Sequence, residues 1–226
     1  MKILVIDDNP SHRKAAYQTL GHEHELTVVG SHDEAVELVR EKPCDREKLL
    51  RLKAEAEAAG YGWCGEVWAK AMEECKLPYW DAVLSDLLMP AGRKTQGGNG
   101  LQYVGTEMPI GWALAIDAAL EGAKFVAVVT DMDHHSHPAS AMLDRMDRGV
   151  FPVAGAKALF TNHVKRVGIT GTEGPCRECG GTGKCRRAND STYDCYTCHA
   201  TGVDYAEKGK DWKDILNRLT SGEQEE

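Results

Sequence analysis

Five of the eight cysteines lie between residues 176 and 198, and four of them form two Cys-x-x-Cys pairs. Cys176 pairs with Cys179, Cys195 pairs with Cys198, and glycines follow both pairs closely. Four thiolates from two such pairs can surround one Zn²⁺ tetrahedrally, while glycines allow the tight turns around the metal. Four sulfur ligands leave no open coordination position, so the pattern predicts a structural rather than a catalytic zinc ion.

The segments CRECGGTGKC (176–185) and CYTCHATG (195–202) resemble the zinc-binding repeat of the DnaJ co-chaperones, Cys-x-x-Cys-x-Gly-x-Gly. The first fits fully, whereas the second has Ala200 in place of the first glycine. The resemblance implies the four paired cysteines as ligands and leaves Cys185 and His199 spare. It includes no J-domain signature, so it implies no chaperone activity. Free or disulfide-bonded thiols are the alternative to zinc. The scattered cysteines are expected to be ordinary packed residues: Cys44, Cys64 and Cys75.

Acidic and hydroxyl side chains end several short apolar runs elsewhere in the chain. Asp7 and Asp8 follow ILVI, Asp86 ends DAVLSD, and Thr130 ends FVAVVT. Ligands of an open parallel α/β sheet bind at the carboxyl ends of its strands, so these residues are expected to meet at one rim. Clustered carboxylates repel one another unless a cation lies between them, and oxygen ligands favour a hard ion such as Mg²⁺.

Strand-like and helix-like segments alternate along the chain, which predicts a parallel sheet with helices on both faces. Strands are expected at 3–6, 26–29, 81–86, 125–130 and 157–161, and helices at 10–20, 31–40, 109–120, 139–146 and 212–219. Ser31 and Glu34 form a capping-box signature at one helix start. Three segments interrupt the alternation: a helical insertion at 42–78, a Gly-rich loop at 91–108, and a zinc-binding insertion at 171–204. One α/β domain then comprises residues 1–170 and 205–222.

The acidic pair in VIDDNP, the sequence SDLLMP and the threonine that closes VAVVT together resemble the receiver domain of bacterial response regulators. The resemblance covers residues 1–41, 79–90 and 109–162 and the last helix. It implies an α/β fold with a five-stranded parallel sheet of the flavodoxin-like, doubly wound type. It also implies site roles: Asp86 as phosphoacceptor, Asp7, Asp8, Asp86 and the Leu88 carbonyl as Mg²⁺ ligands, and Thr130 as a contact of the phosphoryl group.

The sequence departs from the receiver pattern at the end of the fifth strand. Receivers carry a lysine there, whereas Asn162 occupies that position here and brings no charge to a phosphoryl group. Lys157 and Lys165 lie nearby but outside the motif position.

The leading interpretation is an atypical receiver protein of a phosphorelay, phosphorylated on Asp86 with Mg²⁺. It would not be an enzyme beyond its own phosphorylation and dephosphorylation. The zinc segment would present a surface to a protein partner, a histidine kinase or another signalling protein. Three alternatives stay open: a metal-dependent hydrolase or phosphatase that uses the Asp and His rim, a degenerate receiver-like scaffold, and a zinc-dependent nucleic-acid binder. DMDHHSHPAS adds three histidines to that rim, which could bind a metal or begin a helix: His134, His135 and His137.

Charge and hydropathy narrow these choices. The net charge of −8 disfavours a nucleic-acid binder, and acidic residues outnumber basic ones eleven to eight from Glu173 to Glu226. Lys184, Arg186 and Arg187 are therefore expected to form a solvated face. No apolar run is long enough to span a membrane, and MKILVIDDNP does not fit a secretory signal. A cytoplasmic protein is expected.

The position of the cysteine segment links the two sites. It lies between the fifth strand and the last helix, and that connection leaves from the carboxyl end of the sheet. The zinc segment is therefore expected to flank the acidic pocket and either to cover it or to relay its state to a partner.

Overall fold

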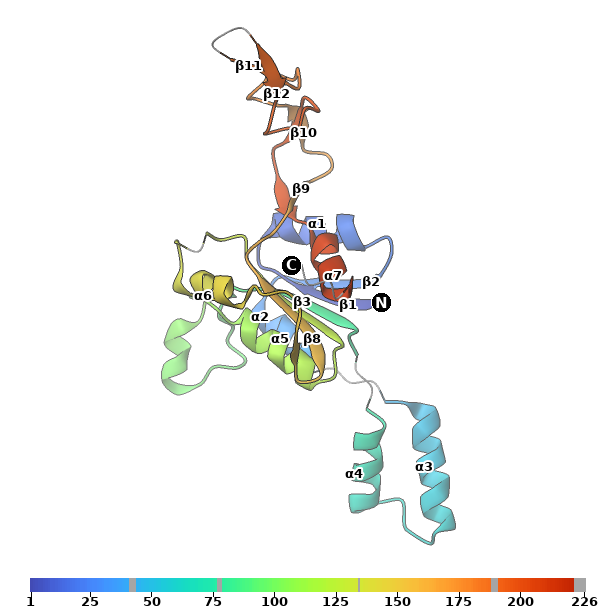
Figure 1. The fold of residues 1–226 in the computed structure, drawn as a ribbon. Coiled ribbons are helices and arrows are strands. Elements are labelled where there is room, and N and C mark those ends of the chain that lie inside the picture. Colours follow the sequence, from blue (N-terminus) through green and yellow to red (C-terminus); the bar gives the residue numbers. More distant parts are fainter. Residues whose placement is uncertain (41–43, 77–78, 134, 188–190, 222–226) are drawn as a thin grey trace.

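The computed structural model describes residues 1–40, 44–76, 79–133, 135–187 and 191–221. It is an α/β protein built on a mainly parallel six-stranded sheet (Figure 1). The strand order is β2-β1-β3-β6-β8-β7. The strands of the sheet are β1 (Lys2–Ile6), β2 (Glu25–Val29), β3 (Ala82–Asp86), β6 (Phe125–Val129), β7 (Phe151–Val153) and β8 (Ala156–Thr161). The expected alternation of strands and helices is confirmed.

The sixth strand corrects the expectation of a five-stranded, wholly parallel sheet. β7 pairs antiparallel with β8 and covers its edge. The two strands are joined by Ala154 and Gly155, both of which have positive φ (47° and 88°). Two consecutive residues with positive φ make a turn whose twist suits a two-residue hairpin. The local sequence VAGA therefore builds a hairpin where the sequence analysis expected a single strand.

Helices cover both faces of the sheet, as expected. They are α1 (Pro10–Leu20), α2 (His32–Val39), α5 (Gly111–Leu120), α6 (Pro138–Met146) and α7 (Trp212–Ser221). Alternate residues of β1 divide between two cores, because successive side chains of a strand point to opposite faces. Leu4 and Ile6 join residues of α2, α5 and α6 in one core. Ile3 and Val5 join residues of α1 and α7 in the other.

Local sequence explains where several helices begin. Asn9 caps α1 by accepting a hydrogen bond from the Ser11 backbone N–H at 2.9 Å, and Pro10 occupies the first helical turn. Ser31 caps α2 by accepting from the Glu34 N–H at 3.3 Å and donates its own hydroxyl to the Glu34 carboxylate at 2.9 Å. The capping residues predicted at 31 and 34 therefore act together.

The helical insertion projects from one end of the sheet as an antiparallel pair, α3 (Arg46–Ala58) and α4 (Gly65–Glu74) (Figure 1). No residue of α3 is buried, and in α4 only Ala71 is. The Gly-rich loop contains a 3₁₀ helix (η1, Gly98–Tyr103) and a two-residue ladder between β4 (Met89–Pro90) and β5 (Glu107–Met108). None of the described helices is long and apolar enough to cross a membrane.

The cysteine segment projects from the opposite end as a narrow arm (Figure 1). Its root is an antiparallel ladder of β9 (Arg166–Gly168) and β14 (Lys208–Lys210). Beyond the root lie two further antiparallel ladders. They pair β10 (Glu173–Pro175) with β13 (Val203–Tyr205) and β11 (Lys184–Arg186) with β12 (Thr192–Asp194). The part of the arm beyond its root, residues 173–187 and 191–205, which we call the zinc-binding ribbon, extends away from the sheet and does not cover the acidic rim (Figure 1).

Gly111 begins α5 where the helix passes directly under the end of β3. A Cβ at this position would lie 1.9 Å from the Asp86 carbonyl oxygen. We expect Gly111→Ala to lower the free energy of unfolding by about 1–3 kcal/mol, the usual cost of overpacking, although alanine favours helices. Gly97→Ala is the matched control, because a Cβ at Gly97 meets nothing within 4 Å. Equal denaturant midpoints for the two variants would contradict this packing.

Candidate functional site

Three carboxylates meet at the carboxyl ends of two neighbouring strands. Asp7 and Asp8 follow β1, Asp86 ends β3, and one oxygen from each lies within 4.8 Å of the others. Asp7 is fully buried and Asp86 is nearly so. These three residues therefore come together as predicted. Because the site is buried, water solvates their charges poorly.

A lysine that the sequence analysis did not identify lies between two of the carboxylates. The ammonium of Lys210 is 2.8 Å from Asp7 Oδ2 and 2.8 Å from Asp86 Oδ1, and the side chain is completely buried. Burial lowers the pKa of Lys210, but the charges of Asp86 and Asp7 outweigh it and raise that pKa overall. Lys210 is therefore a protonated, built-in cation of the acidic cluster.

Lys210 escaped detection because it follows the whole cysteine segment. It is the last residue of β14 and comes two residues before α7. A lysine was sought directly after the fifth strand, where Asn162 stands. The sequence does contain a signal, GKDW, in which Lys210 stands just before the amphipathic last helix. If the cysteine segment were absent, this lysine would lie between the fifth strand and that helix.

The residues after β8 turn away from the acidic cluster. The Asn162 side chain donates to the Asp144 carboxylate. Lys165 pairs with Asp214 at 2.6 Å, and Lys157 is exposed on β8. None of these three reaches the carboxylates. Lys210, and none of these three residues, brings a positive charge into contact with the acidic cluster.

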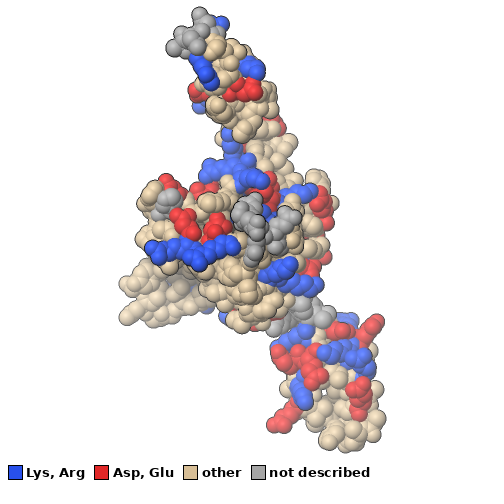
Figure 2. Space-filling model, viewed as in Figure 1, with Lys and Arg blue, Asp and Glu red and all other residues tan. Residues whose placement is uncertain are grey.

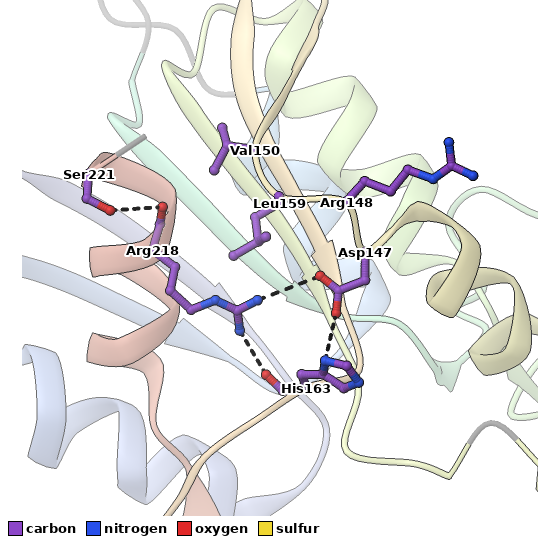
Figure 3. A pocket seen from close by; sticks show the side chains of 8 residues that line it. Asp147, Arg148, Val150, Leu159, His163, Arg218 and Ser221 are labelled. Carbon is purple, nitrogen blue, oxygen red and sulfur yellow. Dashed lines mark hydrogen bonds and ion pairs between the residues drawn. The ribbon is translucent and has the colours of Figure 1, made fainter. Parts of the chain in front are cut away.

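Figure 3 shows where the chain after β8 is held instead, beside a cavity of about 280 Å³. Asp147 accepts a hydrogen bond from the Thr161 hydroxyl at 2.6 Å and lies 3.3 Å from His163 Nδ1. Arg218 of α7 points toward Asp147 and donates to the His163 carbonyl at 2.8 Å. This network ties α7 to the end of β8, and its cavity is lined by none of the acidic-cluster residues.

The acidic cluster carries more negative charge than Lys210 balances. Burial raises the pKa of Asp86 to about 7, Lys210 opposes the rise and Asp7 adds to it. Burial and the neighbouring Asp7 also raise the pKa of Asp8. Both shifts disfavour ionisation, as expected where carboxylates lack sufficient counter-charge. These three aspartates form a group that could hold a metal ion.

The oxygen atoms available there suit a hard cation. Asp86 Oδ1 accepts from the Leu87 N–H and from Lys210, both at 2.8 Å. Within the described part of the chain, Asp86 Oδ2 and the Asp8 carboxylate accept no hydrogen bond from another residue. One or two carboxylates with water and substrate oxygens are the ligands that Mg²⁺ takes. The carboxylate oxygens of the cluster are of the chemical type that such an ion binds.

The remaining rim residues surround this cluster. Thr130 is buried after β6, and its hydroxyl accepts from the Met132 N–H at 3.2 Å. Leu88 is buried two residues after Asp86. Asp131 contacts His12 Nε2 at 3.4 Å and pairs with Arg166 of β9. The hydrogen bond from His12 is the main interaction that lowers the pKa of Asp131, so this carboxylate stays ionised.

The histidines of the β6–α6 loop do not gather into a metal site in the described structure. His134 lies outside the described residues. His137 is the N-cap of α6, and its Nδ1 accepts from the Ala139 N–H at 3.1 Å. The residue groups that can hold a metal within the described ranges are the four cysteines and the three aspartates. His137 therefore begins a helix, in agreement with the second interpretation of this segment.

The four paired cysteines come together at the arm's zinc-binding ribbon. Their sulfur atoms lie within 4.8 Å of one another, with Cys176 3.8 Å from Cys195 and Cys179 3.7 Å from Cys198. Ligands at the usual Zn–S length of about 2.3 Å in a tetrahedron are about 3.8 Å apart. These four cysteines are thus close enough to hold a zinc ion, as predicted, and Cys185 packs beside them.

The two halves of the ribbon repeat the same backbone geometry. The Gly183 N–H donates to Cys179 Sγ and the Gly202 N–H donates to Cys198 Sγ, each at 3.3 Å. A Cβ at either glycine would lie 2.2 Å from a carbonyl oxygen of the other half. Ala200, which replaces a glycine of the repeat, has a positive φ of 65°. The second half therefore keeps the turn at a cost that glycine would avoid.

Cys179→Ser tests the zinc site against Cys185→Ser, which changes a neighbouring thiol that is not in the four-sulfur cluster. We expect about one zinc per chain in wild type and in Cys185→Ser, and a large loss in Cys179→Ser because a three-sulfur site binds zinc less tightly. Elemental analysis of protein purified without chelator measures this. The arm should lose order without zinc while the sheet persists. Equal zinc content in both variants would rule out this ligand set.

Asp86→Asn tests the charge balance of the acidic cluster. The folded chain binds a proton at Asp86 more tightly than the unfolded chain does, so through this group wild-type stability falls as pH rises from about 4 to about 7. We expect the variant to unfold with a free energy about 1–3 kcal/mol higher at about pH 8, and with no gain at about pH 4. Chemical denaturation at both pH values measures the difference.

Asp117→Asn is the control for that experiment, because Asp117 pairs with Arg40 on the surface of α5. Its effect should be small at both pH values, since surface ion pairs contribute little. A pH-independent effect of Asp86→Asn would contradict the charge imbalance at the cluster.

No family model matches the chain, and no curated protein or solved structure matches it. What the acidic cluster and the zinc-binding ribbon do must therefore be argued from their own geometry.

Proposed function

We propose that this chain is an atypical response-regulator receiver that accepts a phosphoryl group on Asp86 in a phosphorelay. The observation that carries the proposal is the position of Asp86. It ends the central strand β3, lies against Asp7 and Asp8, and is contacted by the ammonium of Lys210 at 2.8 Å. A carboxylate can attack phosphorus, and acids that hold a metal ion together with a lysine can neutralise the charge on the phosphoryl oxygens.

The topology supports this proposal. The five parallel strands follow the order β2-β1-β3-β6-β8, which corresponds to the 2-1-3-4-5 order of flavodoxin-like, doubly wound sheets. In such sheets the ligand site lies where the winding reverses, between the first and third strands. Asp7 and Asp86 end those two strands here. β7 is then an addition at the edge of β8, far along the sheet from that point.

The chemistry follows from the charges. An Asp86 oxygen attacks the phosphorus of a small donor or a phosphohistidine, an O–P bond forms, and the bond to the leaving group breaks. The leaving group departs with the electron pair and takes a proton from water. Mg²⁺, when bound by Asp7, Asp8 and Asp86, would neutralise charge on the phosphoryl oxygens. Lys210 contacts one Asp86 oxygen, and we expect its ammonium to pair with the phosphoryl group. Thr130 is the first residue after β6, and we expect its hydroxyl to contact the phosphoryl group as well.

The proposed role is signalling rather than turnover. The partner would be a histidine kinase or another signalling protein. A hydrolase that uses the same rim would need a general base, yet His12 Nε2 already contacts Asp131 and His137 caps α6. Nucleic-acid binding is also less well supported. Lys184 pairs with Asp194, and the face of the arm in Figure 2 carries acidic side chains among the basic ones.

Phosphoryl transfer from a small acyl phosphate or phosphoramidate, with and without Mg²⁺, tests this proposal. Intact mass spectrometry should detect one Mg²⁺-dependent phosphoryl group per chain, absent in Asp86→Asn. Lys210→Met should label about tenfold less or worse, because the charge-assisted contact to the phosphoryl group is lost. Lys213→Met, which removes an exposed lysine of the same region, should label normally.

Two outcomes would contradict the receiver proposal. Wild type that stays unlabelled, under conditions that label an ordinary receiver, would favour a scaffold that no longer takes phosphate. Steady release of phosphate over many turnovers, without accumulation of labelled protein, would favour the hydrolase.

A further inference from the structure

The root of the arm brings two cations to the acidic rim. Arg166 of β9 and Lys210 of β14 are cross-strand partners in the root ladder. Lys210 contacts Asp7 and Asp86, while Arg166 pairs with Asp131, the residue after Thr130. A single residue pair of this ladder therefore neutralises carboxylates at the ends of three strands of the sheet. Any shift of this ladder would move both charges at once.

The ladder is held against α1 with little freedom. A Cβ at Gly209 would lie 2.5 Å from both the Ser11 carbonyl oxygen and the Ala15 Cβ. Just before β14, Glu207 pairs with Lys14 at 2.8 Å. On the other strand, Gln18 donates to the Gly168 carbonyl at 3.0 Å. These contacts fix where β14 lies, so they fix where the Lys210 side chain enters the sheet.

Among the described residues, the cysteine segment leaves and re-enters the domain at this ladder, and Ile169 and Thr170 just beyond it also contact the domain. The chain leaves after Gly168 and returns at Lys208, which are paired with each other. Between them the described ladders are three residue pairs each, too short to be stable alone. The cysteines form a cluster of their own, separate from both cores of the sheet. Without metal, residues 169–207 form a long loop whose closure entropy opposes the root ladder.

We infer that the zinc-binding ribbon is a positioning device for Lys210. Four-cysteine metal binding shortens the effective loop between β9 and β14, which keeps the root ladder paired and the ammonium between Asp7 and Asp86. Loss of zinc frees the ladder and withdraws positive charge from the acidic cluster. The consequence for phosphorylation rests on the function proposed above, whereas the placement of Lys210 does not.

Amine labelling followed by peptide mass spectrometry tests this placement directly. Lys210 is completely buried, so an amine-reactive reagent modifies it only when the root opens. Lys124, whose side chain is 67% exposed and lies at the start of β6, serves as the internal reference. The full-length chain is compared as purified, after chelation, after zinc is restored, and as Cys179→Ser and Cys185→Ser.

We expect Lys210 to label roughly tenfold faster or more after chelation and in Cys179→Ser, because local opening exposes it, while Lys124 is unchanged. Restored zinc should return wild type, but not Cys179→Ser, to the protected state. Cys185→Ser should behave as wild type. Lys210 that stays protected in Cys179→Ser shown to contain no zinc would overturn the inference. So would loss of the sheet's circular dichroism in that variant, because the ribbon would then support the whole domain rather than its root.

A second variant tests whether a paired root ladder is enough to protect Lys210 when the cysteines are absent. Replacing residues 174–204 by Asn-Gly removes all the paired cysteines and joins the paired residues Glu173 and Tyr205 through a two-residue hairpin. This folded variant should protect Lys210 without any zinc. Rapid labelling of Lys210 in it would overturn the inference. Phosphoryl labelling of Asp86 is measured in parallel: if wild type takes no phosphate but Lys210 still follows zinc, only the proposed function fails.

Discussion

The buried contact of one ammonium with two carboxylates is the constraint on which the rest of the structure depends. Lys210, Asp7 and Asp86 are all nearly or fully withdrawn from water. Each ion pays a desolvation penalty of several kcal/mol, which good geometry and full pairing must offset. Lys210 lies on β14, Asp86 lies on β3 and Asp7 directly follows β1, so these strands must meet in one fixed register. The packing of β14 on α1 and of β1 beside β3 is what maintains it.

The two insertions differ in their relation to this contact. The α3–α4 pair enters between α2 and β3, at the amino edge of the sheet, and projects from the end opposite the arm (Figure 1). The arm enters between β8 and α7 at the carboxyl edge, where the carboxylates lie. Because ligand sites of parallel sheets form at the carboxyl edge, the arm can contribute a side chain to the acidic cluster and the α3–α4 pair cannot. It does so through Lys210.

Most of the regular elements could be predicted from local patterns. Apolar runs marked β1, β3 and β6, and Ser31 with Glu34 marked a helix start, because caps depend on neighbours in the chain. The antiparallel edge strand β7 was missed. Its existence depends on a two-residue turn with positive φ at Ala154, an alanine that carries no strong turn signal. Because that turn forms, β7 pairs with the edge of β8 and covers it.

The cysteine ligands and the three aspartates were determined by the sequence alone. Two close Cys-x-x-Cys pairs can meet through turns of a few residues, and strand-ending acids meet whenever parallel strands are neighbours. Lys210 was decided by tertiary structure. Its partner Asp7 is 203 residues away, and nothing in the local spacing records that contact. An ammonium and a carboxylate are attracted in many arrangements, so charge alone names no partner. Only the return of the arm beside α1 selects this one.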